Sequence, residues 1–393
     1  METQRKMHIC VIQNVELGTT EALSVFLTNI AKGLSSNGAV VDLIVSNASE
    51  APKELVHQVH SIFTTGTKLY SIFDNLKFSI TAFFILRRIQ KISNLDIIHC
   101  IRPNSSLLGA TLFKVFVKHD AKIIYNVRSP WIDVAVLRKH IRPVFSWMFK
   151  HLAYFSEFVL SKFVWRFVFV SKPLLDYYSK MLHLSDSKTI VIPPGVDTEH
   201  FVHCPTDEIK KKLRKGPDNI FIGHVGGLSY ERDLTFIIEA FKKIFEKDKR
   251  YRLVFVGDGP AKDMLQALSN DLGIGEFVIF TGKVVRDDVP KYMSILDIGI
   301  SHLPDNLAYR CSFPLKILEY LSCKVPVVAS DIVAHRDILN SIRGVFLYEF
   351  TIDSFVKTIV QVSKNVSNAD YFIESQIQKY NWSVLAERYL RIL

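Results

Sequence analysis

Short runs of apolar, mostly β-branched residues alternate along the chain with longer stretches in which apolar residues recur every three or four positions. The short runs predict buried strands, and the longer stretches predict amphipathic helices. Strands are expected in the first half at 8–13, 39–46, 96–101, 121–127, 166–171 and 189–194. Strands are expected in the second half at 219–225, 252–257, 277–280, 296–301 and 325–329. Regular alternation of this kind indicates an α/β fold with parallel sheets.

A polar, basic stretch at 200–218, broken by Pro205 and by Gly216-Pro217, separates the two halves. We place the domain joint there, because such residues interrupt regular structure. The first domain is expected at 1–203 and the second at 218–375, each a doubly wound parallel sheet, with a deep cleft between them. A last helix is expected over 376–393, packed back on the first domain. A length of 393 residues fits two domains.

The chain carries 49 Lys and Arg against 39 Asp and Glu, a formal net charge of +10. This excess favours anionic partners. No nucleic-acid-binding motif is present, so we expect no nucleic acid partner, and no G-x-G-x-x-G follows an early strand, which disfavours a dinucleotide-dependent oxidoreductase. The five cysteines are scattered without a C-x-x-C pair, which favours a reducing compartment. Since the amino-terminal segment lacks a signal-peptide cleavage site, we expect a cytoplasmic protein.

Residues 139–172 mix aromatic and aliphatic side chains with Lys and Arg. Glu157, Lys162 and Arg166 interrupt the apolar run, so a transmembrane helix is rejected. Two interpretations remain: core helices followed by a strand, or a basic, aromatic face that rests on the cytosolic side of an anionic membrane. The segment 61–92 has the same character and the same two interpretations.

Glycines follow two of the predicted strands in the second half. Gly226 and Gly227 lead from a strand toward a helix, with Arg232 at the mouth of the turn. Backbone amides, a helix amino terminus and a guanidinium together suit a phosphate. Gly259 lies in a second such turn, which is either a structural turn or a ligand contact. Val284 lies in a loop that could meet a nucleobase through backbone atoms.

The segment 311–331 carries the strongest chemical signal. Phe313-Pro314-Leu315 should open a helix, with Ser312 just before it, and Lys316 and Glu319 then share one face near its amino end. This arrangement places an ammonium beside a diphosphate and a carboxylate where it can accept bonds from two ribose hydroxyls. An ordinary surface Lys–Glu pair is the alternative.

The order of GGL with RD, GDGP, FTG and PLKILEYLSCKVPVVASD resembles the carboxyl-terminal half of the retaining GT-B glycosyltransferases of family four, the glycosyl transferases group 1. The resemblance covers residues 219–340. It implies a GT-B architecture of two Rossmann-like domains that face each other across a cleft. It also implies transfer of a sugar from a nucleotide diphosphate to a hydroxyl, with retention and without a cofactor. We expect a role in the synthesis of lipid-linked glycans, surface polysaccharides or glycolipids.

The same resemblance assigns roles to single residues. Glu319 matches the family acid that holds the ribose, and Arg232 matches a basic residue on the phosphates. Gly227 stands where the family has a further Arg, and Lys316 is the candidate to replace that cation. Cys311 stands where the family often has an acid that faces the transferred sugar, and a thiol cannot offer the same acceptor to sugar hydroxyls. Ser312 and Asp305 are the candidate substitutes.

In the first half, residues 125–133 resemble a subgroup loop of the form R-x-x-W-x-D/E. Arg128 and Asp133 would orient the acceptor, and Trp131 would stack on a sugar. A buried Trp beside an Arg–Asp ion pair is the alternative. Gly18 and Thr19 resemble the family's glycine loop, which approaches the donor phosphates.

No D-x-D sequence occurs, and the thirteen histidines show no metal-ligand spacing. We therefore expect a metal-independent reaction in which Arg232 and Lys316 meet the charge of the leaving diphosphate. Two rivals share the scaffold: a nucleotide-sugar epimerase, and a nucleotide-sugar-binding protein whose catalysis is impaired, which Cys311 makes conceivable.

Overall fold

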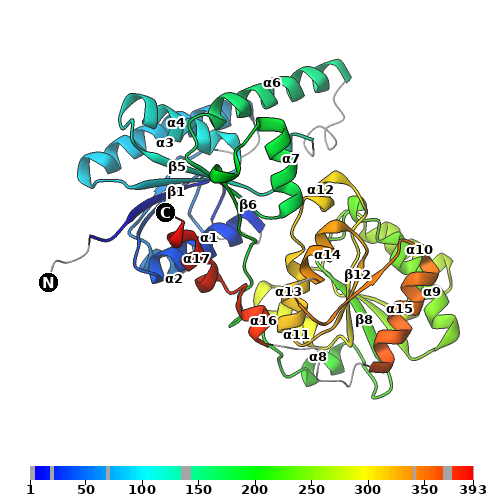
Figure 1. Cartoon of the computed structure of the whole chain (residues 1–393). Helices are drawn as coiled ribbons and strands as arrows, with labels where there is room; N and C mark the ends of the chain where they lie inside the picture. Colours follow the sequence, from blue (N-terminus) through cyan, green and yellow to red (C-terminus); the bar gives the residue numbers. More distant parts are fainter. Residues whose placement is uncertain are drawn as a thin grey trace. The chain divides into compact units, whose positions relative to one another are not determined.

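The structure is a computed structural model that describes residues 5–17, 22–67, 71–133, 143–339, 342–365 and 374–392. The chain divides into two compact units (Figure 1). The first unit comprises Met1–Pro194 together with Trp382–Leu393, and the second comprises Gly195–Asn381. Each unit is described by itself below.

The first unit contains a seven-stranded, fully parallel sheet in the order β3-β2-β1-β4-β5-β6-β7. Its strands are β1 (His8–Ile12), β2 (Val40–Val45), β3 (Ser61–Thr64), β4 (Ile97–Ile101), β5 (Lys122–Val127), β6 (Arg166–Phe169) and β7 (Thr189–Val191). The sequence predicts all of these except β3. That strand has only four residues at the sheet edge and no fully buried side chain, so it lacks the apolar run that marks the others.

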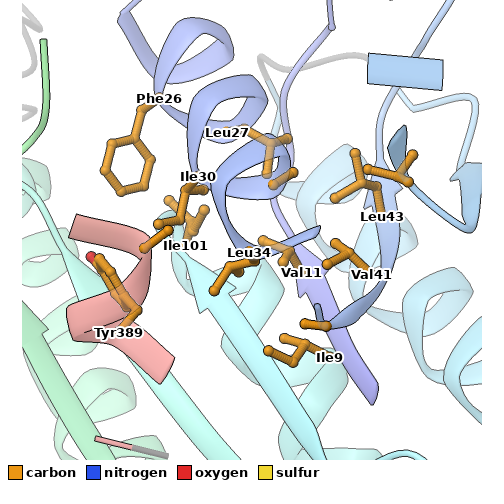
Figure 2. Close-up of a cluster of buried hydrophobic side chains, with 14 of the residues drawn as sticks. Ile9, Val11, Phe26, Leu27, Ile30, Leu34, Val41, Leu43, Ile101 and Tyr389 are labelled. Carbon is orange, nitrogen blue, oxygen red and sulfur yellow. The ribbon is translucent and has the colours of Figure 1, made fainter. Parts of the chain in front are cut away.

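The helices of this unit are α1 (Ala22–Ser36), α2 (Lys53–Gln58), α3 (Ile72–Ile92), α4 (Asn104–Phe116), α6 (Pro143–Ser161), α7 (Lys172–Leu182) and α17 (Trp382–Arg391). Helix α17, from the end of the chain, lies beside α1 near its beginning (Figure 1). Tyr389 of α17 joins Phe26 and Ile30 of α1 and Ile101 of β4 in one buried cluster (Figure 2). The first unit therefore needs both ends of the chain to complete its core.

The second unit contains a six-stranded, fully parallel sheet in the order β10-β9-β8-β11-β12-β13. Its strands are β8 (Ile220–Val225), β9 (Tyr251–Val256), β10 (Val278–Phe280), β11 (Ile298–Ser301), β12 (Val327–Ser330) and β13 (Val345–Tyr348). The sequence analysis missed only β13. Its helices are α8 (Asp207–Lys212), α9 (Thr235–Lys247), α10 (Lys262–Asp271), α11 (Val289–Ser294), α12 (Leu307–Arg310), α13 (Leu315–Ser322), α14 (Val333–Leu339), α15 (Ile352–Asn365) and α16 (Glu374–Gln378).

The predicted joint at 200–218 is wrong, because the division falls between Pro194 and Gly195. Val196, Phe201 and Ile209 are buried in a core cluster of the second unit, which binds the polar, basic stretch to that unit. The predicted single helix at 376–393 is also wrong. It consists of α16, in the second unit, and α17, in the first.

Both sheets change winding direction between two central strands. β1 lies between β2 and β4, and β8 lies between β9 and β11, so the chain runs outward on both sides from these strands. In open parallel sheets such switch points place ligands beyond the carboxyl ends of the strands. The loop after β8 and the loop that leads into α13 are therefore the first places to look for chemistry.

Candidate donor site in the second unit

Lys316 and Gly226 meet at the carboxyl end of β8. The Lys316 ammonium donates a hydrogen bond to the carbonyl oxygen of Val225, the last residue of the strand. Gly226 has a φ of 140°, and a Cβ built there would lie 1.4 Å from Lys316 Nζ. Only glycine fits this position, because any side chain would displace the ammonium and would strain the backbone.

Two cations share the mouth of this turn. Burial and the charge of Arg232 lower the pKa of Lys316 to about 7, while the charge of Glu319 acts in the opposite direction. Arg232 ends the 3₁₀ turn Tyr230–Arg232, with its Cζ 6.0 Å from the centroid of the Tyr309 ring. A buried lysine beside a second cation is a place where a ligand anion would be favoured. The arrangement suits a phosphate or diphosphate.

Glu319 lies one helical turn beyond Lys316 on α13. Burial raises the pKa of its carboxyl above the ordinary value, although the charges of Lys316 and Arg286 lower it. No residue in the described part of the chain donates a hydrogen bond to this carboxylate. Its acceptor capacity is thus available to hydroxyl groups of a ligand. Arg286 ends up near Glu319 although 33 residues separate them, and the sequence analysis expected only backbone contacts from that loop.

The loops after β8 and β9 support each other. The Leu228 amide donates to the Asp258 carbonyl (3.0 Å), and the Ala261 amide donates to the Leu228 carbonyl (2.9 Å). A Cβ at Gly259 would lie 2.4 Å from the Leu228 carbonyl oxygen, so this glycine lets the two loops pack. Gly227, in contrast, is exposed with open space around it. A glycine at position 259 is therefore explained by the packing of these two loops.

The remaining predicted residues of this unit lie around the start of α13 or in the loop after β10. Leu315, the first residue of α13, and Val284 are both half-buried and pack against the apolar core beneath. The Ser312 hydroxyl donates to the Tyr309 carbonyl (2.8 Å), and Cys311 is buried. Asp305 is held by two hydrogen bonds from Arg310, at 2.6 and 2.7 Å. Both candidate substitutes for the missing acid therefore already have hydrogen-bond partners within the protein.

Two residues of the site escaped the sequence analysis. The Val225 amide donates to the Tyr320 hydroxyl (2.8 Å), which itself donates to the Gly223 carbonyl (3.2 Å) and so fixes the end of β8. His224 is fully buried, and burial together with the charges of Lys316 and Arg232 lowers its pKa well below the ordinary value. A neutral imidazole there adds no third cation. Nothing in the sequence around Tyr320 or His224 indicates these roles, because both depend on contacts between distant segments.

In the first unit, Arg128 follows β5 and stacks on α1. Its Cζ lies 3.7 Å from the centroid of the Phe26 ring, and burial lowers the pKa of its guanidinium to about 10. The Nη1 atom is buried and makes no hydrogen bond with any described residue. A buried guanidinium nitrogen without a partner is costly, and an anionic or hydroxyl group of a ligand would satisfy it.

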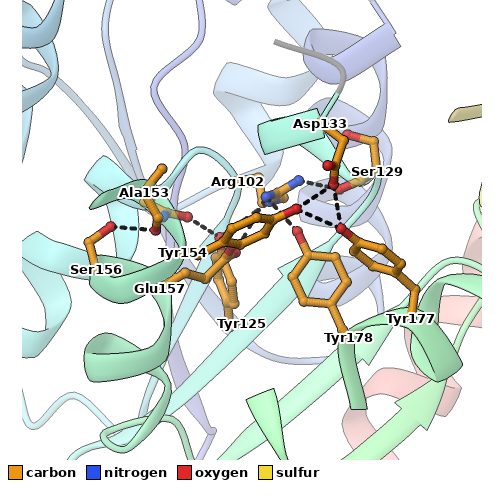
Figure 3. Close-up of polar contacts among 11 residues, drawn as sticks. Arg102, Tyr125, Ser129, Asp133, Ala153, Tyr154, Ser156, Glu157, Tyr177 and Tyr178 are labelled. Atoms are coloured by element: carbon orange, nitrogen blue, oxygen red, sulfur yellow. Dashed lines mark hydrogen bonds and ion pairs between the residues drawn. The ribbon is translucent and has the colours of Figure 1, made fainter. Parts of the chain in front are cut away.

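Asp133 is engaged elsewhere. It accepts hydrogen bonds from Tyr154 at 2.6 Å and from Tyr177 (Figure 3). It also forms an ion pair with Lys150 at 2.7 Å. These contacts lower the pKa of its carboxyl despite partial burial, which by itself would raise it. Asp133 and Arg128 form no ion pair with each other, so the alternative of an Arg–Asp ion pair in this loop is wrong.

A second network holds the same loop. Arg102 donates to Glu157 (3.3 Å), Tyr178 (2.8 Å) and the Ser129 carbonyl, and its Cζ lies 5.3 Å from the centroid of the Trp131 ring (Figure 3). Glu157 and Arg102 are both buried, so each compensates the charge of the other. Glu157, which interrupts the apolar run of α6, thus has a structural role as the buried partner of Arg102. Trp131 packs on this network.

Two further predictions concern the first unit. Gly18 and Thr19 lie outside the described residues. The histidine spacing predicted no metal site, yet the fold brings His8, Asp42 and His60 together at or just before three neighbouring strands.

Among the helices that the structure describes, none combines the length and the apolar character needed to cross a bilayer.

Comparison with known families agrees with this geometry. The model for "Glycosyl transferases group 1" matches residues 205–379, and the model for "Glycosyltransferase Family 4" matches residues 23–200. An uncharacterized glycosyltransferase of Methanocaldococcus jannaschii is 23% identical, over 94% of this chain and 93% of that protein.

Two named proteins add detail. A GDP-mannose-dependent α-(1-6)-phosphatidylinositol monomannoside mannosyltransferase of Mycolicibacterium smegmatis is 29% identical, over 35% of this chain and 37% of that protein. HepE of Anabaena, solved in complex with UDP, superposes with a TM-score of 0.72 at 16% identity, over 98% of both chains. The two family matches, the two parallel-sheet units and the structural likeness together show that the chain belongs to the group 1 glycosyltransferases of GT-B fold.

Proposed function

We propose that this glycosyltransferase takes its sugar from a nucleotide diphosphate donor held by the second unit. One observation carries the proposal: the Lys316 ammonium is hydrogen-bonded at the carboxyl end of β8, where it feels the charge of Arg232 as a like-charge repulsion, with Glu319 one turn further along α13. A bound diphosphate would relieve that repulsion. The Glu319 carboxylate would then accept hydrogen bonds from the two ribose hydroxyls.

Names of similar proteins support this donor class. HepE was solved with UDP, and the mycobacterial mannosyltransferase depends on GDP-mannose. Both ligands share the ribose and the diphosphate, which are the parts that Glu319, Lys316 and Arg232 suit.

We further propose that the reaction retains the anomeric configuration and uses neither a metal ion nor a cofactor. The acceptor oxygen forms its bond to the anomeric carbon on the face from which the diphosphate leaves, and the bond between that carbon and the phosphate oxygen breaks. The acceptor proton passes to an oxygen of the leaving phosphate. Lys316 and Arg232 stabilise the negative charge that develops there.

We place the acceptor at a membrane surface, because two helices of the first unit expose apolar stripes. On α6, Met148, Leu152, Phe155 and Val159 follow helical spacing and are 54%, 66%, 65% and 41% exposed. Apolar side chains gathered on one exposed helix face mark an interaction site rather than a solvated surface.

On α3 the exposed stripe is apolar at its start and basic at its end. Phe73, Ile80 and Phe84 are exposed, and Arg87 and Arg88 follow on the same helix. The single acid of α6, Glu157, is buried. Apolar stripes accompanied by exposed cations fit an anionic lipid surface. The phosphatidylinositol mannoside named for the mycobacterial relative is an acceptor of this type.

A donor panel tests the proposal. The protein is incubated with UDP-, GDP- and ADP-sugars, each with and without a membrane lipid extract. Donor consumption that requires the extract supports transfer to a lipid acceptor. Epimerised donor without acceptor would establish the epimerase instead, and binding of nucleotide sugars without any turnover would establish an impaired binding protein.

A further inference from the structure

His8, Asp42 and His60 meet at the amino-terminal edge of the first sheet. His8 begins β1, Asp42 lies in β2, and His60 directly precedes β3. Parallel pairing of β1 with β2 and of β2 with β3 brings these positions together. His8 Nε2 lies 2.8 Å from Asp42 Oδ2, and His60 Nδ1 lies 2.9 Å from Asp42 Oδ1. One potential ligand atom from each residue lies within 4.8 Å of the other two.

The Asp42 carboxylate is buried, and its side-chain hydrogen-bond partners among the described residues are the two histidines. The Asp42 side chain is 2% exposed, and no Lys or Arg of the described ranges pairs with it. The neighbouring Arg5 forms an ion pair with Asp96 (3.0 Å) instead. Asp96 also accepts a hydrogen bond from the His8 amide (2.8 Å). A buried carboxylate is costly unless it is paired or coordinates a metal, and a divalent cation held by all three side chains would supply that compensation.

We propose that His8, Asp42 and His60 bind a divalent transition metal, with Zn²⁺ as the best fit. Two imidazole nitrogens and one carboxylate oxygen are preferred zinc ligands, with bonds of about 2.0–2.2 Å. To accept such an ion, the Asp42 carboxylate has to move slightly away from His8 Nε2 and His60 Nδ1, which now lie at hydrogen-bonding distance from it. Ser93 Oγ, 3.1 Å from His8 Nδ1, supplies the outer partner that orients a metal-bound imidazole. The His60 side chain is 58% exposed, which gives the ion an entry path and leaves a fourth position for water.

The position in the fold indicates what the metal does. The cluster lies at the amino ends of parallel strands, whereas chemistry in such sheets occurs beyond their carboxyl ends. The ion would link the amino-terminal ends of β1, β2 and β3. We therefore infer a stabilising site that is separate from sugar transfer, and this inference does not depend on the donor proposal.

Calorimetric titration with Zn²⁺ tests the site on the full chain after dialysis against a chelator. Wild type should bind one ion at the cluster, and its melting temperature should rise by about 5–10 °C at a hundredfold excess of Zn²⁺ over Kd. Co²⁺ in place of Zn²⁺ should give a visible absorption band typical of nitrogen and oxygen ligation. Donor turnover should stay unchanged.

His60→Ala is the informative variant, because the exposed side chain can be removed without loss of the fold. It should lose the thermal shift and the Co²⁺ band, and Asp42→Asn should lose them too. His57→Ala is the matched control, since His57 is an exposed histidine three residues away on α2 and should leave both signals intact. Absence of stoichiometric binding in wild type, or wild-type affinity in His60→Ala, would overturn the proposal.

Discussion

The Lys316 ammonium has one hydrogen-bond partner, the Val225 carbonyl, and two charged neighbours, Arg232 and Glu319. The sequence analysis obtained its role from the spacing of Lys316 and Glu319 and from a family motif. The lowered pKa of the ammonium could not be predicted, because it depends on burial and on Arg232, which lies 84 residues earlier in the chain. That pKa has consequences for binding.

Donor affinity should depend on pH through Lys316. In the free protein the pKa of Lys316 is about 7, and a bound diphosphate would raise it, so binding above that pH requires uptake of a proton. The Kd for a nucleotide sugar should be constant below about pH 6 and should rise up to tenfold per pH unit above about pH 7. Calorimetry across this range measures it. Lys316→Arg should flatten the profile because arginine stays charged, and a flat wild-type profile would refute the assignment.

Gly226→Ala should abolish donor binding, since its Cβ would lie 1.4 Å from Lys316 Nζ. The strain of a positive φ adds roughly 1–3 kcal/mol of instability. Gly38→Ala separates the two effects, because Gly38 also has a positive φ, 92°, but nothing within 4 Å of the added carbon. Loss of affinity in Gly226→Ala and normal affinity in Gly38→Ala are expected. Equal affinities would show that the clash is harmless.

At the scale of elements, apolar runs in the sequence predict every strand except β3 and β13, which lie at edges of their sheets. Strand length does not separate these two from the rest, because β7 and β10 have three residues each and are predicted. The sequence pattern predicts the start of α13 and the shared face of Lys316 and Glu319, since helical spacing is local. It cannot predict that Arg286 reaches Glu319, or that His8, Asp42 and His60 meet. The histidine–aspartate cluster depends on strand pairing, and the approach of Arg286 to Glu319 depends on the packing of a loop and a helix that are far apart in sequence.

The exposed stripe of α6 should govern membrane binding. Leu152→Asp combined with Phe155→Asp removes two apolar side chains that are 66% and 65% exposed and adds negative charge. Co-sedimentation with anionic vesicles should fall at least tenfold, from the loss of about 1–2 kcal/mol of apolar burial and added repulsion. Met264→Asp on α10 is the control, because that side chain is exposed in the second unit. Vesicle binding unchanged in the double variant would exclude this surface.

At the scale of the whole molecule, the chain crosses to the second unit and returns, so α17 completes the core of the first. Leu385 is fully buried in that core. Leu385→Ala should cost about 2–5 kcal/mol and lower the unfolding temperature of the first unit, with little effect on nucleotide binding by the second. Val384→Ala, at a position 38% exposed, is the control. Scanning calorimetry with and without a bound nucleotide resolves the two transitions, and an equal shift of both would contradict this division.

The account as a whole depends on the use of Lys316 and its neighbours to hold a nucleotide diphosphate sugar during transfer. The most direct measurement is kcat/KM for the donor with Lys316→Met, beside the control Lys247→Met at an exposed position on α9. We predict a loss of about two orders of magnitude for Lys316→Met and none for the control. Near-normal kcat/KM in Lys316→Met would contradict the account.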